Sequence, residues 1–225
     1  MVTLDFAAVL VEWPQLARGA AFTVGLTAVS AVLGVALGVA CGWARAWGPR
    51  WLGIVVAAYV ELIRNTPFIV QLFFVFFGLP SLGVKLTPEL ASVIAMVINL
   101  GAYAAEIARA GIEGTPRGQI EAARSLALTE TQVFVRVVLP PALARVWPAM
   151  TSQIVIVMLG SAVCGQIAAQ ELSYYANLIQ SRNFRAFEAY IVATLVYLGL
   201  AVALRGLLNW AGPRLIFGRM PAAGR

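Results

Sequence analysis

Long apolar stretches separated by short polar segments dominate the chain. Five of them contain about 20 or more mostly apolar residues, the length at which a helix crosses a bilayer. They occupy roughly residues 20–43, 52–79, 89–109, 147–168 and 186–209. This pattern predicts an all-α, polytopic membrane protein with five transmembrane helices.

Local signals refine this picture at three places. Glycines at 34, 38 and 42 lie on one helix face, where a second backbone can approach closely, so we expect helix packing rather than a direct role in function. Thr87-Pro88-Glu89 is typical of a helix N-terminus. In 169–185, helical spacing predicts a short amphipathic helix on the outer surface, with an apolar face of Leu172, Tyr175, Ala176 and Ile179.

The basic residues between the apolar stretches predict the orientation. With the N-terminus outside, the inner segments hold far more basic residues than the outer ones, as expected for cytoplasmic loops. The outer side then has only Arg18, Lys85, Arg182 and Arg185. The inner side has Arg45, Arg50, Arg109, Arg117, Arg124, Arg136, Arg145, Arg205, Arg214, Arg219 and Arg225. We therefore expect an outer N-terminus and a cytoplasmic C-terminus.

Composition excludes several classes of protein. Of the 225 residues, 61% are hydrophobic and 12% are charged, about half the charged share of a soluble domain. The chain has no histidine, and Asp5 is its only aspartate, which excludes Ser-His-Asp triads and histidine-ligated metal sites. The net charge of +6 belongs to the loops between apolar stretches, so we expect a lipid bilayer and no nucleic acid as partner.

Two further features concern the cysteines and the N-terminus. Cys41 and Cys164 fit no zinc or redox spacing, and they fall near opposite faces of the bilayer, so we expect no disulfide. Asp5 and Glu12 stand where a secretory signal would have basic residues. We therefore expect no cleavable signal.

The segment 110–146 is too polar to cross a membrane. Thr115-Pro116 predicts the start of one helix, and Thr129 with Gln132 forms a capping box for a second. We expect the second helix to end before Leu139-Pro140-Pro141. Such a helix–turn–helix between two spans is expected to be cytoplasmic, to lack a core of its own and to contact a partner.

Glu121-Ala122-Ala123, followed at the appropriate distance by Val138-Leu139-Pro140, resembles the EAA loop of bacterial ABC-importer permeases. Ala127 stands where the family pattern has glycine, and Val137 where it has isoleucine. If that glycine is left-handed, an alanine there costs about 1–2 kcal/mol. Segments 61–74, 102–112, 117–119 and 180–188 are similar to the polar amino acid (histidine/glutamine/glutamate/arginine-type) permeases. The resemblance extends from about Gly19 to Arg214, in a chain expected to form one domain over 1–225.

This resemblance implies a multi-pass subunit of the bacterial cytoplasmic (inner) membrane that imports amino acids. Its implied partners are a second permease subunit, identical or paralogous, a pair of ATPase subunits and an extracytoplasmic solute-binding protein. The residues implied in ATPase coupling are Glu121, Ala122, Ala123, Ala127, Leu139 and Pro140. The sole lysine, Lys85, lies outside any P-loop pattern, so we expect no enzyme activity, no cofactor and ATP bound only by the partner.

The second span carries Glu61 and Arg64 near mid-membrane, followed by Thr66-Pro67. Ionisable groups at that depth pair with one another, face the bundle interior or line water. We expect Pro67 to kink or interrupt the helix and Thr66 to cap its outer half, an arrangement that often frames a transport site. Two interpretations stay open: an ion pair that only holds the fold, or direct contact with substrate.

Polar residues of the third and fourth spans complete the predicted substrate path. Asn99 and Tyr103 share a helix face, and Gln153 faces them from the fourth span, where hydrogen bonding between helices is the alternative role for Asn99. The path thus comprises Glu61, Arg64, Thr66, Pro67, Asn99, Tyr103 and Gln153. We expect Glu106 and Arg109 to form an ion pair near the inner interface.

Three other functions compete with this interpretation. An ion-coupled secondary amino acid transporter half would use Glu61 as its coupling carboxylate. An intramembrane enzyme would need catalytic groups that the chain lacks. A structural assembly subunit would tolerate replacement of Glu61 and Arg64. The sequence leaves the transported amino acid open.

Overall fold

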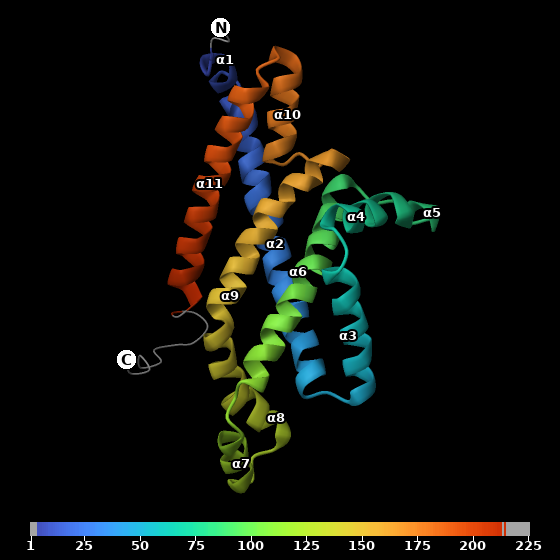
Figure 1. Cartoon of the computed structure of the whole chain (residues 1–225), viewed down its shortest axis with the longest axis vertical. Helices are drawn as coiled ribbons and strands as arrows, with labels where there is room; N and C mark the ends of the chain where they lie inside the picture. Colours follow the sequence, from blue (N-terminus) through green and yellow to red (C-terminus); the bar gives the residue numbers. More distant parts are fainter. Residues whose placement is uncertain (1–3, 213, 215–225) are drawn as a thin grey trace.

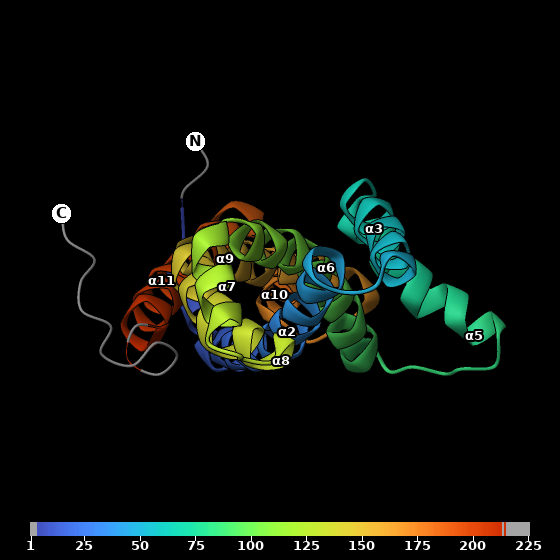
Figure 2. The ribbon, with the colours of Figure 1, turned by 90° about the horizontal axis from the view of Figure 1, so that it is seen from below.

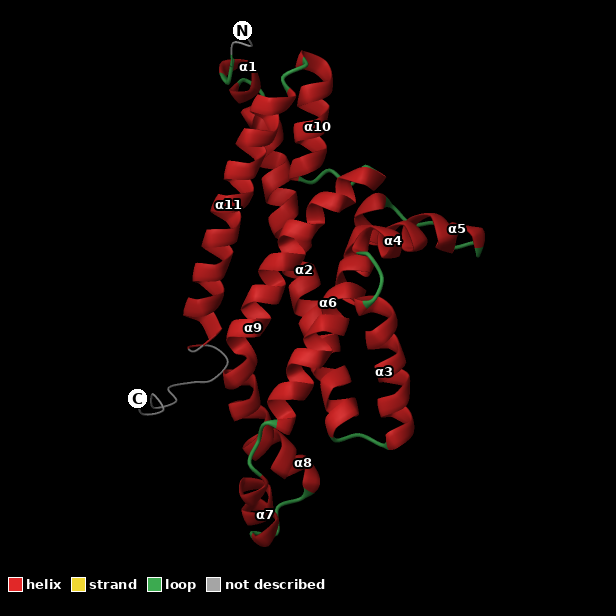
Figure 3. Ribbon diagram, viewed as in Figure 1, coloured by secondary structure: helices red, strands yellow, loops and turns green. Residues whose placement is uncertain are grey.

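The computed structural model describes residues 4–212 and 214, and every regular element within them is helical (Figures 1 and 3). The α-helices are α1 (Ala7–Leu10), α2 (Trp13–Ala46), α3 (Arg50–Arg64), α4 (Phe68–Phe73), α5 (Leu79–Ser81), α6 (Pro88–Glu113), α7 (Arg117–Ser125), α8 (Glu130–Val133), α9 (Leu139–Gly160), α10 (Leu172–Asn183) and α11 (Ala186–Ala211). Two π-helical turns, η1 (Phe74–Gly78) and η2 (Phe134–Val138), and a 3₁₀ helix, η3 (Ser161–Ile167), connect some of them. The all-α prediction is confirmed. Arg219 and Arg225, two of the basic residues that predict the orientation, lie outside the described part of the chain.

Four helical units in the described residues are long and apolar enough to cross a membrane: α2, α6, the continuous unit Glu130–Ile167 and α11. The second predicted span is different. It is a pair of helical segments, Arg50–Arg64 and Phe68–Ser81, bent by 108° at the break. In Figure 1, α4 and α5 project sideways from the bundle at this bend. The expected interruption of the helix at Pro67 is therefore confirmed, and the stretch 52–79 is a broken span.

The fourth span starts earlier than predicted, because the helix does not end before Leu139-Pro140-Pro141. The chain instead passes from α8 through the π-helical turn η2 directly into α9. A proline ring clashes with the carbonyl one turn earlier, and a proline also lacks an N–H donor. The wider π turn lies just before Pro140 and accommodates both effects.

Close packing of α2 on α6 forms the centre of the bundle. A Cβ atom added to Gly38 would lie 2.3 Å from Cβ of Ala104, and one added to Gly42 would lie 2.7 Å from Cβ of Ala108. Gly34 faces Leu100 at similarly short range. The predicted glycine face is therefore confirmed as a helix contact, since only glycine lets the two backbones come this close.

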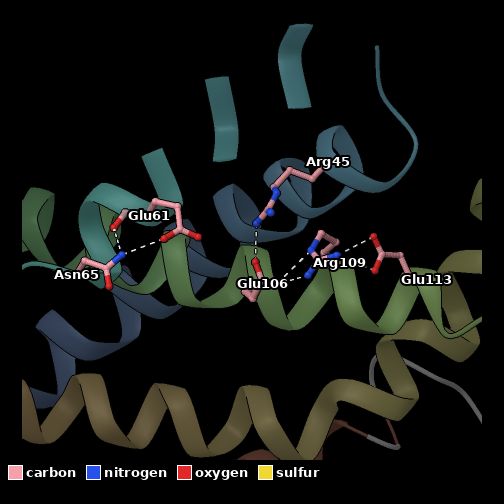
Figure 4. Close-up of polar contacts among 6 residues, drawn as sticks. All are labelled: Arg45, Glu61, Asn65, Glu106, Arg109 and Glu113. Atoms are coloured by element: carbon pink, nitrogen blue, oxygen red, sulfur yellow. Dashed lines mark hydrogen bonds and ion pairs between the residues drawn. The ribbon is translucent and has the colours of Figure 1, made fainter. Parts of the chain in front are cut away.

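An ion-pair network joins α2 to α6 near the end of the bundle that carries α7 (Figure 4). Glu106 pairs with Arg109, as predicted, and also with Arg45 from α2 at 2.5 Å. Arg109 pairs in turn with Glu113 at 2.7 Å. The pairing with Arg45 was not predicted, because the two residues are 61 positions apart in the sequence.

At the other end of the bundle, α10 packs along α2 (Figure 1). Its buried face contains Leu172, Ala176 and Ile179, as predicted. Glu171 caps α10 by accepting hydrogen bonds from the backbone N–H groups of Ser173 and Tyr174. Tyr197 of α11 donates a further bond to this buried carboxylate. Burial raises the pKa of the Glu171 carboxyl.

The two ends of the molecule thus differ in structure. Helices α7 and α8 form one end, and they lie nearest the viewer in the end-on view of Figure 2. Helices α1 and α10 form the other end (Figure 1).

Cys41 and Cys164 are buried, free thiols, so the expected absence of a disulfide between them is confirmed.

Candidate functional site

The break in the second span lies between Arg64, the last residue of α3, and Phe68, the first residue of α4. Pro67 occupies the N-cap position of α4 without a side-chain hydrogen bond. The expectation that Thr66 caps α4 is wrong. Its Oγ1 instead donates to the carbonyl oxygen of Leu62 at 2.9 Å, because the last carbonyls of α3 have no partners within the helix.

Gln71 of α4, to which the sequence assigned no role, is the main side chain that bridges the break. Its Nε2 donates to the carbonyl oxygens of Ile63 at 2.7 Å and Thr66 at 3.0 Å, and to Oγ1 of Thr66 at 2.9 Å. Its Oε1 accepts from Nδ2 of Asn99 at 2.9 Å. A glutamine four residues after a helix-breaking proline, within an apolar run, is the signal that marks this position.

A pocket of about 360 Å³ opens beside the break and is lined by residues of the break itself, α4, α6 and α9. Five residues of the predicted substrate path line it together: Thr66, Pro67, Asn99, Tyr103 and Gln153. The other lining residues are Phe68, Ile156, Val157 and Gly160. The pocket therefore combines neutral hydrogen-bonding groups with an apolar wall.

The two charged residues of the predicted path lie outside this lining and do not pair with each other. The carboxylate of Glu61 accepts from Nδ2 of Asn65 at 2.9 Å (Figure 4). The guanidinium of Arg64 lies over the ring of Tyr103, 5.4 Å from its centroid. The interpretation of Glu61 and Arg64 as an ion pair is therefore wrong, because each side chain has a different partner. Both residues are exposed in the isolated chain.

The segment with the EAA pattern has a small core of its own, contrary to expectation. Ala123 of α7 is only 5% exposed and packs in a cluster with Ile112, Val133, Val138 and Ala142. Its small side chain lets α7 lie against the end of α6 and the turn η2. Glu121 and Ala122 are exposed, whereas Leu139 and Pro140 are half-buried where η2 joins α9. The six residues implied in ATPase coupling therefore do not form one surface.

Ala127 follows α7 with φ of +58°, in the left-handed region. This is the conformation that commonly follows a helix and that favours glycine. The turn thus has the geometry expected of the family glycine, with an alanine in its place. Leu126 beside it is 77% exposed.

An aromatic contact holds α7 to the end of α2. Arg124 forms an ion pair with Glu130 at 2.8 Å, and its guanidinium lies 5.9 Å from the ring centroid of Trp47. Trp47 in turn packs on Phe134 of η2. Hydrogen bonding to Glu130 raises the pKa of Arg124.

The capping box of Thr129 and Gln132 that starts α8 is confirmed. Within the described part of the chain, no cluster of three or more Cys, Asp and Glu residues gathers that could hold a metal ion.

Comparison with known proteins identifies the family. Residues 32–217 match the model of the binding-protein-dependent transport system inner membrane component. The probable glutamine ABC transporter permease protein GlnM of Bacillus subtilis (strain 168) is 38% identical over 166 residues, which is 74% of this chain and 76% of that protein. The L-cystine transport system permease protein TcyB of the same organism is 36% identical over 186 residues, 82% of this chain and 80% of that protein.

Solved structures agree with this match. One described as the crystal structure of an amino acid ABC transporter with histidines superposes with a TM-score of 0.85 at 33% identity, covering 95% of this chain and 100% of that chain. A methionine ABC transporter in an inward-facing conformation shares the fold, with a TM-score of 0.73 at 24% identity over 91% of this chain and 96% of that chain. The chain belongs to the family of binding-protein-dependent transport system inner membrane components and is a permease subunit of an ABC importer.

Proposed function

We propose that this permease subunit carries a polar amino acid through the pocket at the break between α3 and α4. The observation that carries the proposal is the convergence of Asn99, Tyr103 and Gln153, from two separate helices, on one hollow beside a broken span. Discontinuous helices at mid-membrane depth are a recurring way to build a transport site.

The chemistry of the lining favours an amino acid. Two amides and a phenol offer donors and acceptors to the ammonium and carboxylate groups, and Phe68, Ile156 and Val157 offer an apolar wall to the side chain. The volume of about 360 Å³ is at the lower end of the range for small-molecule sites. Two relatives are named for glutamine and L-cystine, and the similar crystal structure is described as an amino acid ABC transporter with histidines.

The proposed assembly follows from the family. ABC-importer permeases work with ATPase subunits and a solute-binding protein. For this chain we propose a second permease subunit, identical or paralogous, two ATPase subunits that bind the ATP, and a solute-binding protein at the end that carries α10. The N-terminus then lies outside and the C-terminus in the cytoplasm. The excess of arginines on the α7 side supports this orientation.

The proposed contact with the ATPase is the exposed part of α7 and the turn that follows it. Glu121 and Ala122 are exposed on α7, and Leu126 offers an apolar side chain beside them. Ala123 has a different role, because it is buried inside the segment. It fixes the position of α7 relative to α6 and α9, so movement of α7 reaches the helices that line the pocket.

Uptake by reconstituted complexes tests the pocket. The permease is inserted into liposomes with its ATPase subunit, any paralogous permease and its binding protein, and is offered labelled L-glutamine, L-arginine, L-cystine, L-histidine and, as a negative control, maltose. We expect ATP-dependent uptake of at least one amino acid, with a higher KM in Gln153→Ala and no change in Gln166→Ala, an exposed glutamine outside the pocket. An unchanged KM in Gln153→Ala contradicts the proposed path. Uptake without ATPase subunits would instead favour the ion-coupled alternative.

A pair of variants at one exposed position tests the coupling surface. Ala122→Arg places a long charged side chain on the outer face of α7 and is expected to abolish uptake while the permease still inserts and folds. Ala122→Ser keeps the side chain small and should transport normally. Full uptake by Ala122→Arg contradicts docking at this surface. Ala123→Arg is a poor test, because it would disrupt the core of the segment itself.

A further inference from the structure

The break between α3 and α4 leaves backbone carbonyl groups without helical partners inside a predicted membrane span. The last four carbonyls of any helix lack partners within it, and Pro67 cannot donate to any of them. In a membrane these groups need partners within the protein. Asn65 donates to the carbonyl oxygen of Glu61 at 2.8 Å, and Thr66 donates to that of Leu62 (Figure 4 shows Asn65 beside Glu61).

Gln71 donates to further acceptors at the break and commits its whole amide to do so, although the carbonyl of Ile63 also accepts weakly from the backbone N–H of Thr66 at 3.4 Å. The two N–H hydrogens of this amide are shared among the carbonyl oxygens of Ile63 and Thr66 and the hydroxyl of Thr66. Its Oε1 accepts from Asn99 of α6. The side chain of Gln71 therefore connects α4 to the end of α3 and, through Asn99, to the lining of the pocket.

Asn99 and Thr66 both line the pocket and bind Gln71, and of the two Asn99 does so from a different helix, α6. One of the Asn99 N–H hydrogens is directed at Gln71. Its Oδ1 has no hydrogen-bond partner among the described residues, so it is free to accept a hydrogen bond from a molecule in the pocket. If the Asn99 side chain turns so that its Oδ1 faces such a molecule, its Nδ2 must move as well, because the two atoms belong to one planar amide. The bond from Nδ2 to Gln71 is then stretched or broken.

We propose that Gln71 is a positioning residue that links occupancy of the pocket to the shape of the break. This inference rests on the proposed function, because it needs a substrate at Asn99. A substrate that changes the Asn99–Gln71 bond shifts the Gln71 amide and with it the carbonyls of Ile63 and Thr66. By reciprocity, any change in the angle between α3 and α4 alters the affinity of the pocket.

A double-mutant cycle on transport tests this linkage. Gln71→Met keeps the length of the side chain and removes its hydrogen bonds, and Asn99→Ala removes the other partner. Loss of one neutral hydrogen bond is expected to raise KM about three- to tenfold. Because the two residues act through one bond, the double variant should resemble the more affected single variant. Multiplicative effects of the two changes overturn the proposal.

A structural measurement separates positioning from general support of the fold. Hydrogen–deuterium exchange of residues 61–72 is followed in the complete complex in lipid nanodiscs, with and without the amino acid that the uptake panel identifies. The wild type should change its exchange in this segment on binding. The response should be lost in Gln71→Met and kept in the Gln166→Ala control. A normal response in Gln71→Met overturns the proposal.

The two experiments distinguish the failure of this inference from the failure of the proposed path. If Gln153→Ala raises KM but Gln71→Met leaves both KM and the exchange response normal, the pocket binds substrate and the linkage is wrong. If Gln153→Ala leaves KM unchanged, the proposed path is wrong and the linkage falls with it. Should Gln71→Met fail to fold, Gln71→Glu retains an acceptor for Asn99 and is carried through the same cycle and exchange measurement.

Discussion

The guanidinium of Arg64 lies over the ring of Tyr103, 5.4 Å from its centroid, at the margin of the pocket. Arg64 makes no ion pair with any described residue, although Glu61 is only one helical turn away. A cation without a carboxylate partner, held against an aromatic residue that lines the pocket, is available to the carboxylate of an amino acid.

Arg64→Met is expected to raise the KM of uptake roughly 30-fold, because the charge–carboxylate attraction and the stacking are each worth about 1 kcal/mol. Arg64→Lys keeps the charge but loses the planar stacking, so its KM should lie between those of the wild type and Arg64→Met. The measurement is the concentration dependence of uptake at equal permease content. If Arg64→Met transports with a normal KM, Arg64 has no part in the path.

Ala127→Gly should maintain or raise stability by up to about 1 kcal/mol, because it removes a Cβ atom from a residue at φ of +58°. Ala122→Gly, within α7, is the matched control and should lower stability by about 0.5–1 kcal/mol. The measurement is the thermal unfolding of the purified complex. A lower unfolding temperature for Ala127→Gly than for Ala122→Gly contradicts the left-handed turn.

Glu106→Gln should destabilise the bundle by about 1.5–3 kcal/mol, because the carboxylate pairs with both Arg45 and Arg109 and is only 26% exposed. Glu113→Gln removes a carboxylate that is 50% exposed and pairs with Arg109 alone, so its cost should stay below about 1 kcal/mol. Chemical unfolding of the two variants in the same detergent compares them. Equal losses would show that the pairing with Arg45 contributes nothing.

The buried carboxyl of Glu171 predicts a pH dependence at the end that carries α10. Burial raises its pKa above the ordinary value of 4.5, so the folded state binds this proton more tightly than the unfolded chain. The resulting stability is fully present below the ordinary pKa and is lost as pH rises through the raised pKa. Glu171→Gln removes the titrating proton and keeps one acceptor oxygen, for the backbone N–H of either Ser173 or Tyr174, so it should flatten this dependence. An unchanged pH profile of unfolding in Glu171→Gln contradicts it.

The features that the sequence predicted well depend on neighbouring residues. The glycine spacing at 34, 38 and 42, the capping box at Thr129 and the helix start at Thr87 are each set within one or two turns. Asn99, Tyr103 and Gln153, which stand out in the sequence as polar residues in apolar spans, line one pocket, while their role as a substrate path stays a prediction. Their convergence required only that the spans pack together.

The features that were missed depend on contacts between distant segments. Gln71 has a role only because the break exposes carbonyls five and eight residues before it. Ala123 is indistinguishable from an exposed alanine until α6, η2 and α9 pack around it. The contact of Arg64 with Tyr103 depends on which helix faces the Arg64 side chain, and periodicity cannot decide that.

Coupling to the ATPase requires that α7 faces the cytoplasm. Single cysteines at Leu126 beside α7 and at Leu82 after α5, both largely exposed, are treated with a membrane-impermeant maleimide. The account predicts that Leu126→Cys stays unlabelled in intact cells and reacts in inverted membrane vesicles, while Leu82→Cys shows the opposite pattern. Labelling of Leu126→Cys from outside intact cells would contradict the account.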